Sequence, residues 1–132
     1  MKSAHTMALM SRGKILKVYK VALGRSSGAK RRKGDHKTPV AMYVVDAEKS
    51  ESRFDAALHV SYPNSEDRAR AARLGQDPGG DIEIHGVEPR FAWLGSAQHW
   101  IDWTDGCIAV TDSQIEKIWP VVRVGTVIEI RP

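Results

Sequence analysis

Residues 102–111 read DWTDGCIAVT and contain the single cysteine of the chain, Cys107, directly after Gly106. A glycine here lets the backbone approach a ligand closely or take a conformation that other residues avoid. Residues 111–114 (TDSQ) fit a capping box, so we expect a strand that ends at Cys107 and then a helix. The positive end of that helix would favour a thiolate, and the backbone amides of Gly106 and Cys107 would be able to face an oxyanion.

A thiol nucleophile needs an imidazole within hydrogen-bond reach to take its proton. His85 ends an alternating stretch and is followed by Gly86, so it is our first candidate for this base. His59 comes next, since it lies within a strand pattern and is either a packed histidine or part of a pocket wall. The alternative is an inert thiol, because a lone cysteine is among the most often buried residue types. The other histidines, expected in polar segments or in a long loop, are His5, His36 and His99.

Outward from this segment, the hydrophobic pattern predicts a mainly β chain with two helices. Strands are expected at residues 14–23, 40–45, 56–62, 81–85 and 126–130, and helices at 65–74 and after 111. In the strand 81–85 (DIEIH), alternation places Ile82 and Ile84 on one face, with Glu83 and His85 on the other. Residues 25–37 and 87–104 lack a regular period and are expected to be loops, the longer one a loop or lid.

Composition predicts one soluble, mildly basic domain that spans residues 1–132. The chain has 132 residues, of which 42% are hydrophobic and 27% charged, and its net charge is +4. A positive charge favours an anionic partner without choosing among nucleic acid, membrane surface and acidic polymer. No apolar run is long enough for a transmembrane helix, and one cysteine excludes an internal disulfide.

Two other kinds of site use some of the same residues. A metal site built from Cys107, His59, His85 and His99 is chemically possible, but the spacings match no usual zinc pattern. The basic run 30–33 (KRRK) fits either a nucleic-acid patch or a solvated loop, and it lacks the interleaved aromatic residues of a nucleic-acid motif.

Segments 84–86 (IHG) and 102–111 are preceded in the chain by blocks at 21–24 (VALG), 34–39 (GDHKTP), 58–64 (LHVSYPN) and 78–82 (PGGDI). In this order, the blocks resemble the catalytic domains of L,D-transpeptidases of the YkuD type. Segments 84–86 and 102–111 resemble the active-site signature of that family. Most members have Ser-His-Gly-Cys where this chain has TDGC at 104–107. The chain therefore resembles a sub-branch with a Trp-Thr-x-Gly-Cys motif, some of whose members resemble amidases that detach lipoprotein from the cell wall.

The resemblance implies a mainly β fold, an L,D-transpeptidase-like β-sandwich or barrel with a helix after the catalytic cysteine and one further short helix. It implies that Cys107 attacks the bond between a diamino acid and the terminal D-alanine of a peptidoglycan stem tetrapeptide. His85 would be the general base, oriented by a backbone carbonyl near Gly86, and Gly106 would help to hold the oxyanion. Residues implied to contact the substrate are His59, Tyr62, Trp103, Thr104 and Asp105.

The same resemblance implies that the resulting thioester is resolved by an amine, which forms a 3→3 cross-link in cell-wall biogenesis. Water as the acceptor would make the enzyme an L,D-carboxypeptidase, and a silent wall-binding domain is the non-enzymatic alternative. Carbapenems are expected to acylate Cys107, while no cofactor, metal, nucleic acid or stable membrane insertion is expected. Asp105 would disfavour a thiolate if it points inward, and would lie in solvent if it points outward.

The location of the protein is the remaining expectation. Peptidoglycan lies outside the membrane, so the resemblance implies a periplasmic or wall-side protein. Residues 1–10 do not read as a secretory signal. We therefore expect export by a signal absent from this chain, or a cytoplasmic protein if the chain is complete.

Overall fold

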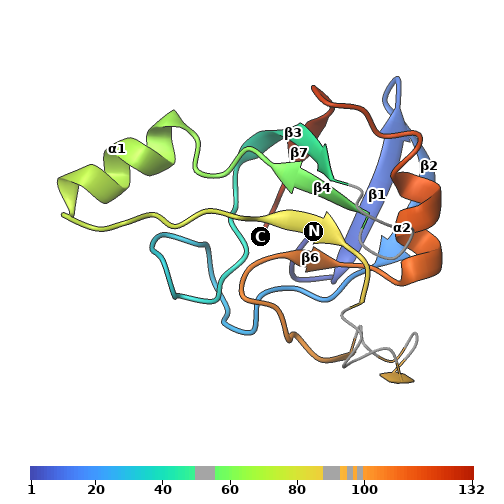
Figure 1. The fold of residues 1–132 in the computed structure, drawn as a ribbon, viewed down its shortest axis with the longest axis horizontal. Coiled ribbons are helices and arrows are strands. Elements are labelled where there is room, and N and C mark those ends of the chain that lie inside the picture. Colours follow the sequence, from blue (N-terminus) through green and yellow to red (C-terminus); the bar gives the residue numbers. More distant parts are fainter. Residues whose placement is uncertain (50–55, 88–92, 95–96, 98–99) are drawn as a thin grey trace.

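A curled five-stranded β-sheet forms the centre of the fold, with a separate β-hairpin beside it (Figure 1). The computed structural model describes residues 1–49, 56–87, 93–94, 97 and 100–132. The elements in chain order are β1 (Thr6–Ser11), β2 (Lys14–Lys20), β3 (Met42–Lys49), β4 (Ala57–Val60), α1 (Ser65–Arg73), β5 (Glu83–His85), β6 (Ile108–Ala109), α2 (Asp112–Ile118) and β7 (Val127–Glu129). This mainly β arrangement with two helices confirms the predicted fold class.

The strand order in the central sheet is β6-β5-β4-β3-β7. Neighbouring strands are antiparallel except for β5 and β6, which run parallel and pair Ile84 with Ile108 and His85 with Ala109. The β1–β2 hairpin closes through Arg12 and Gly13, which both have positive φ. Beyond β2, the chain returns to the central sheet, where Ala22 bridges to Ala109.

The core lies under the apolar faces of β4 and β5. Leu58, Val60, Ile82 and Ile84 are all buried and belong to the main hydrophobic cluster. The prediction that Ile82 and Ile84 share the inner face is confirmed, and Glu83 and His85 are partly exposed on the other face. Burial of such aliphatic side chains is the main stabilising contribution to the fold, on the order of 1.5–3 kcal/mol each.

The helix after the cysteine packs on this core through Ile115 and Ile118, as its spacing predicts. The predicted capping box is present, and the Thr111 amide donates to Oε1 of Gln114 at 3.0 Å. The other helix, α1, lies at the opposite end of the molecule from the hairpin (Figure 1). Its N-cap is Asn64, whose side chain accepts from the amide of Asp67.

The observed elements differ from the prediction in several places. The strands expected at 14–23, 56–62, 81–85 and 126–130 are shorter and span 14–20, 57–60, 83–85 and 127–129. The strand expected at 40–45 begins at Met42, after Pro39 and a short bend, and continues to Lys49. The expectation that Cys107 ends a strand is wrong, because β6 begins one residue later, at Ile108. The N-terminal segment forms a strand of its own, β1, which the hairpin turn pairs with β2.

The loop expected at 25–37 is not uniformly exposed. Lys30 is buried and forms an ion pair with Asp35, with a distance of 3.0 Å between Nζ and Oδ1. Asp35 also accepts from the amides of Arg31, Arg32 and Lys37. Burial would raise the pKa of Asp35, but these hydrogen bonds and the one from Lys30 outweigh it and lower the pKa to about 2. Only Arg31, Arg32 and Lys33 of the basic run are exposed, so it is a solvated turn with one buried anchor.

The described part of the chain contains no helix with the length and apolar character needed to cross a membrane.

Candidate active site

The parallel pairing of β5 and β6 brings Cys107 close to β5. Ile108 lies opposite Ile84, and Ala109 lies opposite His85. Continuing this register by one residue places Cys107 opposite Glu83, two residues along the strand direction from His85. Because side chains alternate along a strand, Cys107 lies on the same face of this strand pair as Glu83 and His85. The structure therefore brings the predicted nucleophile and base to the same edge of the sheet.

The Cys107 thiol is held against the backbone of the chain that enters β5. Its Sγ donates to the carbonyl oxygen of Asp81 at 3.4 Å, and the amide of Glu83 hydrogen-bonds to the sulfur. Burial raises the pKa of Cys107 to about 11, with smaller contributions in the same direction from the carboxylates of Glu83, Asp105 and Asp81. The expected stabilisation of a thiolate is therefore not found, because burial and three acids outweigh any favourable end of the short α2 helix.

The His85 ring is fixed on two sides. Its Nδ1 hydrogen-bonds to the carbonyl oxygen of Gly86, and its ring packs edge-on against Trp103 with 6.0 Å between centroids. A proton on Nδ1 leaves Nε2 as the basic atom, which is the tautomer that a general base requires. Trp103 thus supports the imidazole, and its contact with a substrate stays a prediction.

Glu83 and Lys49 add a charged pair beside the thiol. Lys49 on β3 donates through Nζ to Oε1 of Glu83, and this pairing raises the pKa of Lys49. Alternation along residues 81–85 predicts that Glu83 shares a face with His85, but the sequence predicts no role for Glu83. The face that Glu83 shares with His85 is the feature of the sequence that points to Glu83. Nothing in the sequence points to Lys49, because its pairing with Glu83 depends on the order of the strands in the sheet.

Gly106 is required by the shape of the loop before the cysteine. Its φ is +131°, and a Cβ at this position would lie 2.7 Å from the backbone oxygen of Lys37. Its amide donates to Oγ1 of Thr104 at 3.2 Å, and that hydroxyl donates to the carbonyl oxygen of Cys107 at 2.7 Å. In this structure the Gly106 amide is therefore occupied, so a role for it in holding an oxyanion requires that the bond to Thr104 be exchanged.

Asp105 points away from the thiol. Its Oδ1 lies 2.8 Å from Nδ1 of His36 and 3.2 Å from a guanidinium nitrogen of Arg25, and 74% of its side chain is exposed. Of the two orientations considered, the structure has the outward one. Its charge still contributes to the raised pKa of Cys107.

Two of the predicted substrate residues are buried. Thr104 joins the loop to the chain after β2, because its amide donates to the Leu23 carbonyl. Tyr62 donates its hydroxyl to the carbonyl oxygen of Pro78 at 2.7 Å, and burial raises its pKa to about 12. His59 is partly exposed and lies 2.5 Å from Asp46 through Nδ1. The structure gives Thr104 and Tyr62 structural contacts, and their contact with a substrate stays a prediction.

Two aspartates for which the sequence predicts no role connect the site to its surroundings. Asp102 accepts from the amide of Leu23 at 2.9 Å and pairs with His5. Asp112, the first residue of α2, accepts from the amide of Val87 at 2.9 Å. A Cβ at Gly86 would lie 2.3 Å from Oδ1 of Asp112, so an alanine directly after His85 would displace the carboxylate that binds the Val87 amide.

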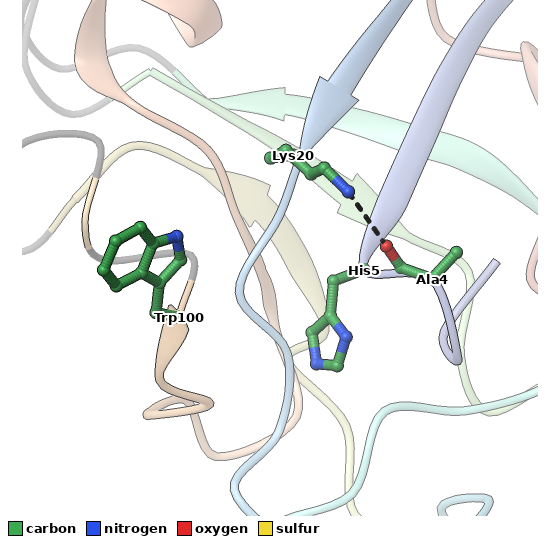
Figure 2. Close-up of a pocket in the computed structure, with 4 residues that line it drawn as sticks. All are labelled: Ala4, His5, Lys20 and Trp100. Atoms are coloured by element: carbon green, nitrogen blue, oxygen red, sulfur yellow. Dashed lines mark hydrogen bonds between the residues drawn. The ribbon is translucent and has the colours of Figure 1, made fainter.

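A separate cavity of about 370 Å³ lies beside the N-terminal turn, lined by Ala4, His5, Lys20 and Trp100. Figure 2 shows the ring of Trp100 across the cavity from Lys20, whose Nζ donates to the Ala4 carbonyl. Cys107 and His85 are not among its lining residues. Among the described residues, no group of three or more His, Cys, Asp or Glu side chains is placed to hold a metal ion. His99, one of the candidate ligands, lies outside the described residues, as do several other residues of the loop expected at 87–104.

Comparison with known proteins identifies the family. The model of the L,D-transpeptidase catalytic domain, YkuD, matches residues 1–130. The chain therefore belongs to the L,D-transpeptidase catalytic domain family, an enzyme family. No curated protein sequence is similar enough to add a relative to this comparison.

Solved structures agree with this assignment. The helical cell shape determining protein Pgp2 from Campylobacter jejuni is 28% identical, with a TM-score of 0.69 over 92% of this chain. An L,D-transpeptidase from Mycobacterium smegmatis is 17% identical, with a TM-score of 0.64 over 98% of this chain. The L,D-transpeptidase LdtMt1, solved with imipenem, is 18% identical, with a TM-score of 0.61 over 96% of this chain. The chain spans 42%, 55% and 54% of these three structures, respectively.

Proposed function

We propose that this domain is a peptidoglycan L,D-transpeptidase that works through a thioester on Cys107. The observation that carries the proposal is the β5–β6 register, which places Cys107 and His85 diagonally across neighbouring strands. The fixed Nδ1 contact of His85 with Gly86 supports it, because this contact directs the basic Nε2 away from the backbone. The matching family model supports a peptidoglycan stem peptide as the substrate.

The first half of the reaction forms the thioester. His85 Nε2 takes the proton from the Cys107 thiol, and Sγ attacks the carbonyl carbon between the diamino acid and D-alanine. The carbon–nitrogen bond then breaks, and the imidazolium returns its proton to the nitrogen of the leaving D-alanine. Because the pKa of Cys107 is raised to about 11, the thiol is neutral at pH 7 and depends on this base.

The second half transfers the acyl group. The side-chain amine of a second stem peptide attacks the thioester carbon and loses a proton to His85. The carbon–sulfur bond breaks and the proton returns to Sγ, which leaves a 3→3 cross-link and a free Cys107 thiol. Since the Gly106 amide is bonded to Thr104 in the free protein, the negative oxygen of each step is stabilised once that amide turns toward it.

The same thioester also supports hydrolysis, which is our second candidate function. Water as the acceptor gives an L,D-carboxypeptidase, and a wall-linked lipoprotein as the leaving group gives an amidase. The observation that favours this candidate is the similarity to Pgp2, a protein described by its effect on helical cell shape. A protein that trims stem peptides rather than joining them fits that description.

We further propose that the domain acts on the periplasmic or wall side of the membrane, where peptidoglycan is found. We also propose that carbapenems acylate Cys107. The imipenem complex of the related L,D-transpeptidase LdtMt1 supports the second proposal.

The test is mass spectrometry of disaccharide-tetrapeptide muropeptides incubated with the purified protein and, in parallel, with the Cys107→Ala variant. Cross-linked dimers that depend on Cys107 are the expected result. Tripeptide without dimers would replace the transpeptidase with a carboxypeptidase. Unchanged muropeptides would leave the amidase, tested next on wall-linked lipoprotein, or a silent wall-binding domain. Activity that survives in Cys107→Ala would contradict the thioester mechanism.

A further inference from the structure

The charge of the chain is divided sharply between its beginning and its remainder. The first 34 residues contain ten of the 20 Lys and Arg residues and no Asp or Glu. All 16 acidic residues lie from Asp35 onward, so the excess positive charge of the protein resides in its N-terminal quarter. A field of one sign that is confined to one region attracts an oppositely charged surface to that region.

The β1–β2 hairpin displays four of these cations. Arg12, Lys14, Lys17 and Lys20 are all exposed. In the part of the chain that the structure describes, no carboxylate forms an ion pair with any of them. The hairpin lies at one edge of the molecule, at the opposite end from α1 (Figure 1). Its positive charge is therefore accessible and not neutralised by the rest of the domain.

Large apolar side chains stand among these cations. Met10, Ile15, Leu16 and Val18 are between 51% and 62% exposed. Tyr19 alone in β2 is buried. Alternation along β2 places Leu16 and Val18 on the face opposite buried Tyr19, together with Lys14 and Lys20. Apolar and basic side chains therefore share one exposed face, which is a feature typical of an interaction surface.

We propose that the exposed face of the β1–β2 hairpin docks on the anionic headgroups of a phospholipid membrane. Lysine and arginine attract such headgroups over roughly one Debye length, and apolar side chains between them enter the boundary between headgroups and acyl chains. This is peripheral docking and not insertion. The inference goes beyond the proposed peptidoglycan chemistry and does not depend on it.

The apolar component distinguishes a lipid surface from a soluble polyanion. A wall polymer or a nucleic acid offers phosphate or carboxylate charges, which Arg12, Lys14 and Lys20 would bind, but it offers no apolar layer for Leu16 and Val18. The second basic cluster of the chain, Arg31, Arg32 and Lys33, is exposed without large apolar neighbours in sequence. The two clusters therefore have the same positive charge in different surroundings.

The experiment is flotation of the protein with vesicles of phosphatidylglycerol and phosphatidylcholine in equal parts, against vesicles of phosphatidylcholine alone. Binding is expected only to the anionic vesicles and is expected to weaken as salt is raised. The variant Arg12→Gln, Lys14→Gln, Lys20→Gln should lose affinity on the order of 100-fold. The matched control Arg31→Gln, Arg32→Gln, Lys33→Gln removes the same charge and should retain most of the affinity. Circular dichroism of each variant checks that the fold is kept.

A second pair of measurements separates the two kinds of anionic partner. The variant Leu16→Thr, Val18→Thr places residues with high strand propensity at both exposed positions. It should bind anionic vesicles severalfold more weakly while binding poly-L-glutamate as the parent does. Absence of vesicle binding by the parent would overturn the proposal, as would equal losses in the two charge variants. Vesicle binding unchanged by Leu16→Thr, Val18→Thr would also overturn it, in favour of a polyanion site.

Discussion

The Cys107 thiol donates its hydrogen to the backbone carbonyl of Asp81 at 3.4 Å. This contact occupies the proton that His85 would have to remove, and the neighbouring acids add to the effect of burial on the thiol. The free protein is therefore in a resting arrangement in which the sulfur is protonated. Rotation of the thiol away from Asp81 has to accompany transfer of its proton to His85.

The first prediction concerns the ionisation of this thiol. Alkylation of the folded protein by iodoacetamide should be slow at pH 7 and should rise with an inflection near pH 11, because the pKa of Cys107 is raised to about 11. An unstructured cysteine peptide serves as the reference, with an inflection near about 8.5. The raised pKa of Cys107 also links folding to pH. Its contribution to the free energy of unfolding is fully present below the pKa of the unfolded thiol and is lost as pH rises toward 11. An inflection below that of the reference would contradict the structure.

The charge of Glu83 should account for part of this shift. Glu83→Gln removes a carboxylate that raises the pKa of Cys107 and releases Lys49 from its ion pair. The alkylation inflection should move to lower pH. Glu48→Gln, a matched change on β3, should leave the inflection in place. If the two variants behave alike, Glu83 does not act on the thiol.

The proposed base is tested by comparing two histidines. His85→Ala should slow acylation of Cys107 by a carbapenem on the order of 100-fold or more, because a positioned base contributes at least about that factor. His59→Ala, which removes a histidine paired with Asp46, should have a much smaller effect. Stopped-flow fluorescence or time-resolved mass spectrometry of the acylated protein gives both rates. An unchanged rate in His85→Ala together with a slow His59→Ala would move the role to His59.

The loop before the thiol should not tolerate a side chain at Gly106. Gly106→Ala places a Cβ 2.7 Å from the Lys37 backbone oxygen at a positive φ. The expected loss in the free energy of unfolding is roughly 2–4 kcal/mol. Gly13→Ala also has a positive φ but has no neighbour within 4 Å, so it should lose only about 1 kcal/mol. Urea unfolding of both variants measures the difference, and equal losses would mean that the close approach to Lys37 is absent.

Asp35 should support the fold down to low pH. Its pKa is lowered to about 2 from 3.8, so its contribution is present above pH 4 and is lost as pH falls through 2. Asp35→Asn also leaves Lys30 buried without its partner, which typically costs about 3–5 kcal/mol. Between pH 6 and pH 2, Asp35→Asn should have a lower unfolding temperature than the parent, and that temperature should depend less on pH. Glu66→Gln, an exposed change on α1, is the control and should follow the parent.

Local sequence patterns were sufficient to predict which faces of β5 and α2 are buried. Ile82 and Ile84 alternate with Glu83 and His85, and the sheet buries the first pair and exposes the second in part. The spacing of Ile115 and Ile118 likewise predicts the buried face of α2. These features are visible in a single sequence because period and burial are linked along one element.

Ion pairs and pKa shifts that depend on segments far apart in the sequence could not be predicted from local patterns. Lys30 lies in a run of four basic residues, and its burial follows from Asp35 and the turn that holds it. The Lys49 ion pair exists because β3, β4 and β5 are neighbours in the sheet. The acidity of Cys107 was expected to increase from the nearby helix, whereas burial and acids on other segments determine it.

Asp102 links both the N-terminal turn, through His5, and the end of the first hairpin, through Leu23, to the segment that leads into Cys107. Because of these two contacts, a substitution at His5 reaches the segment that carries Cys107 without changing any residue of that segment. A loss of turnover on replacing His5 would therefore report a displaced segment and not a missing catalytic group.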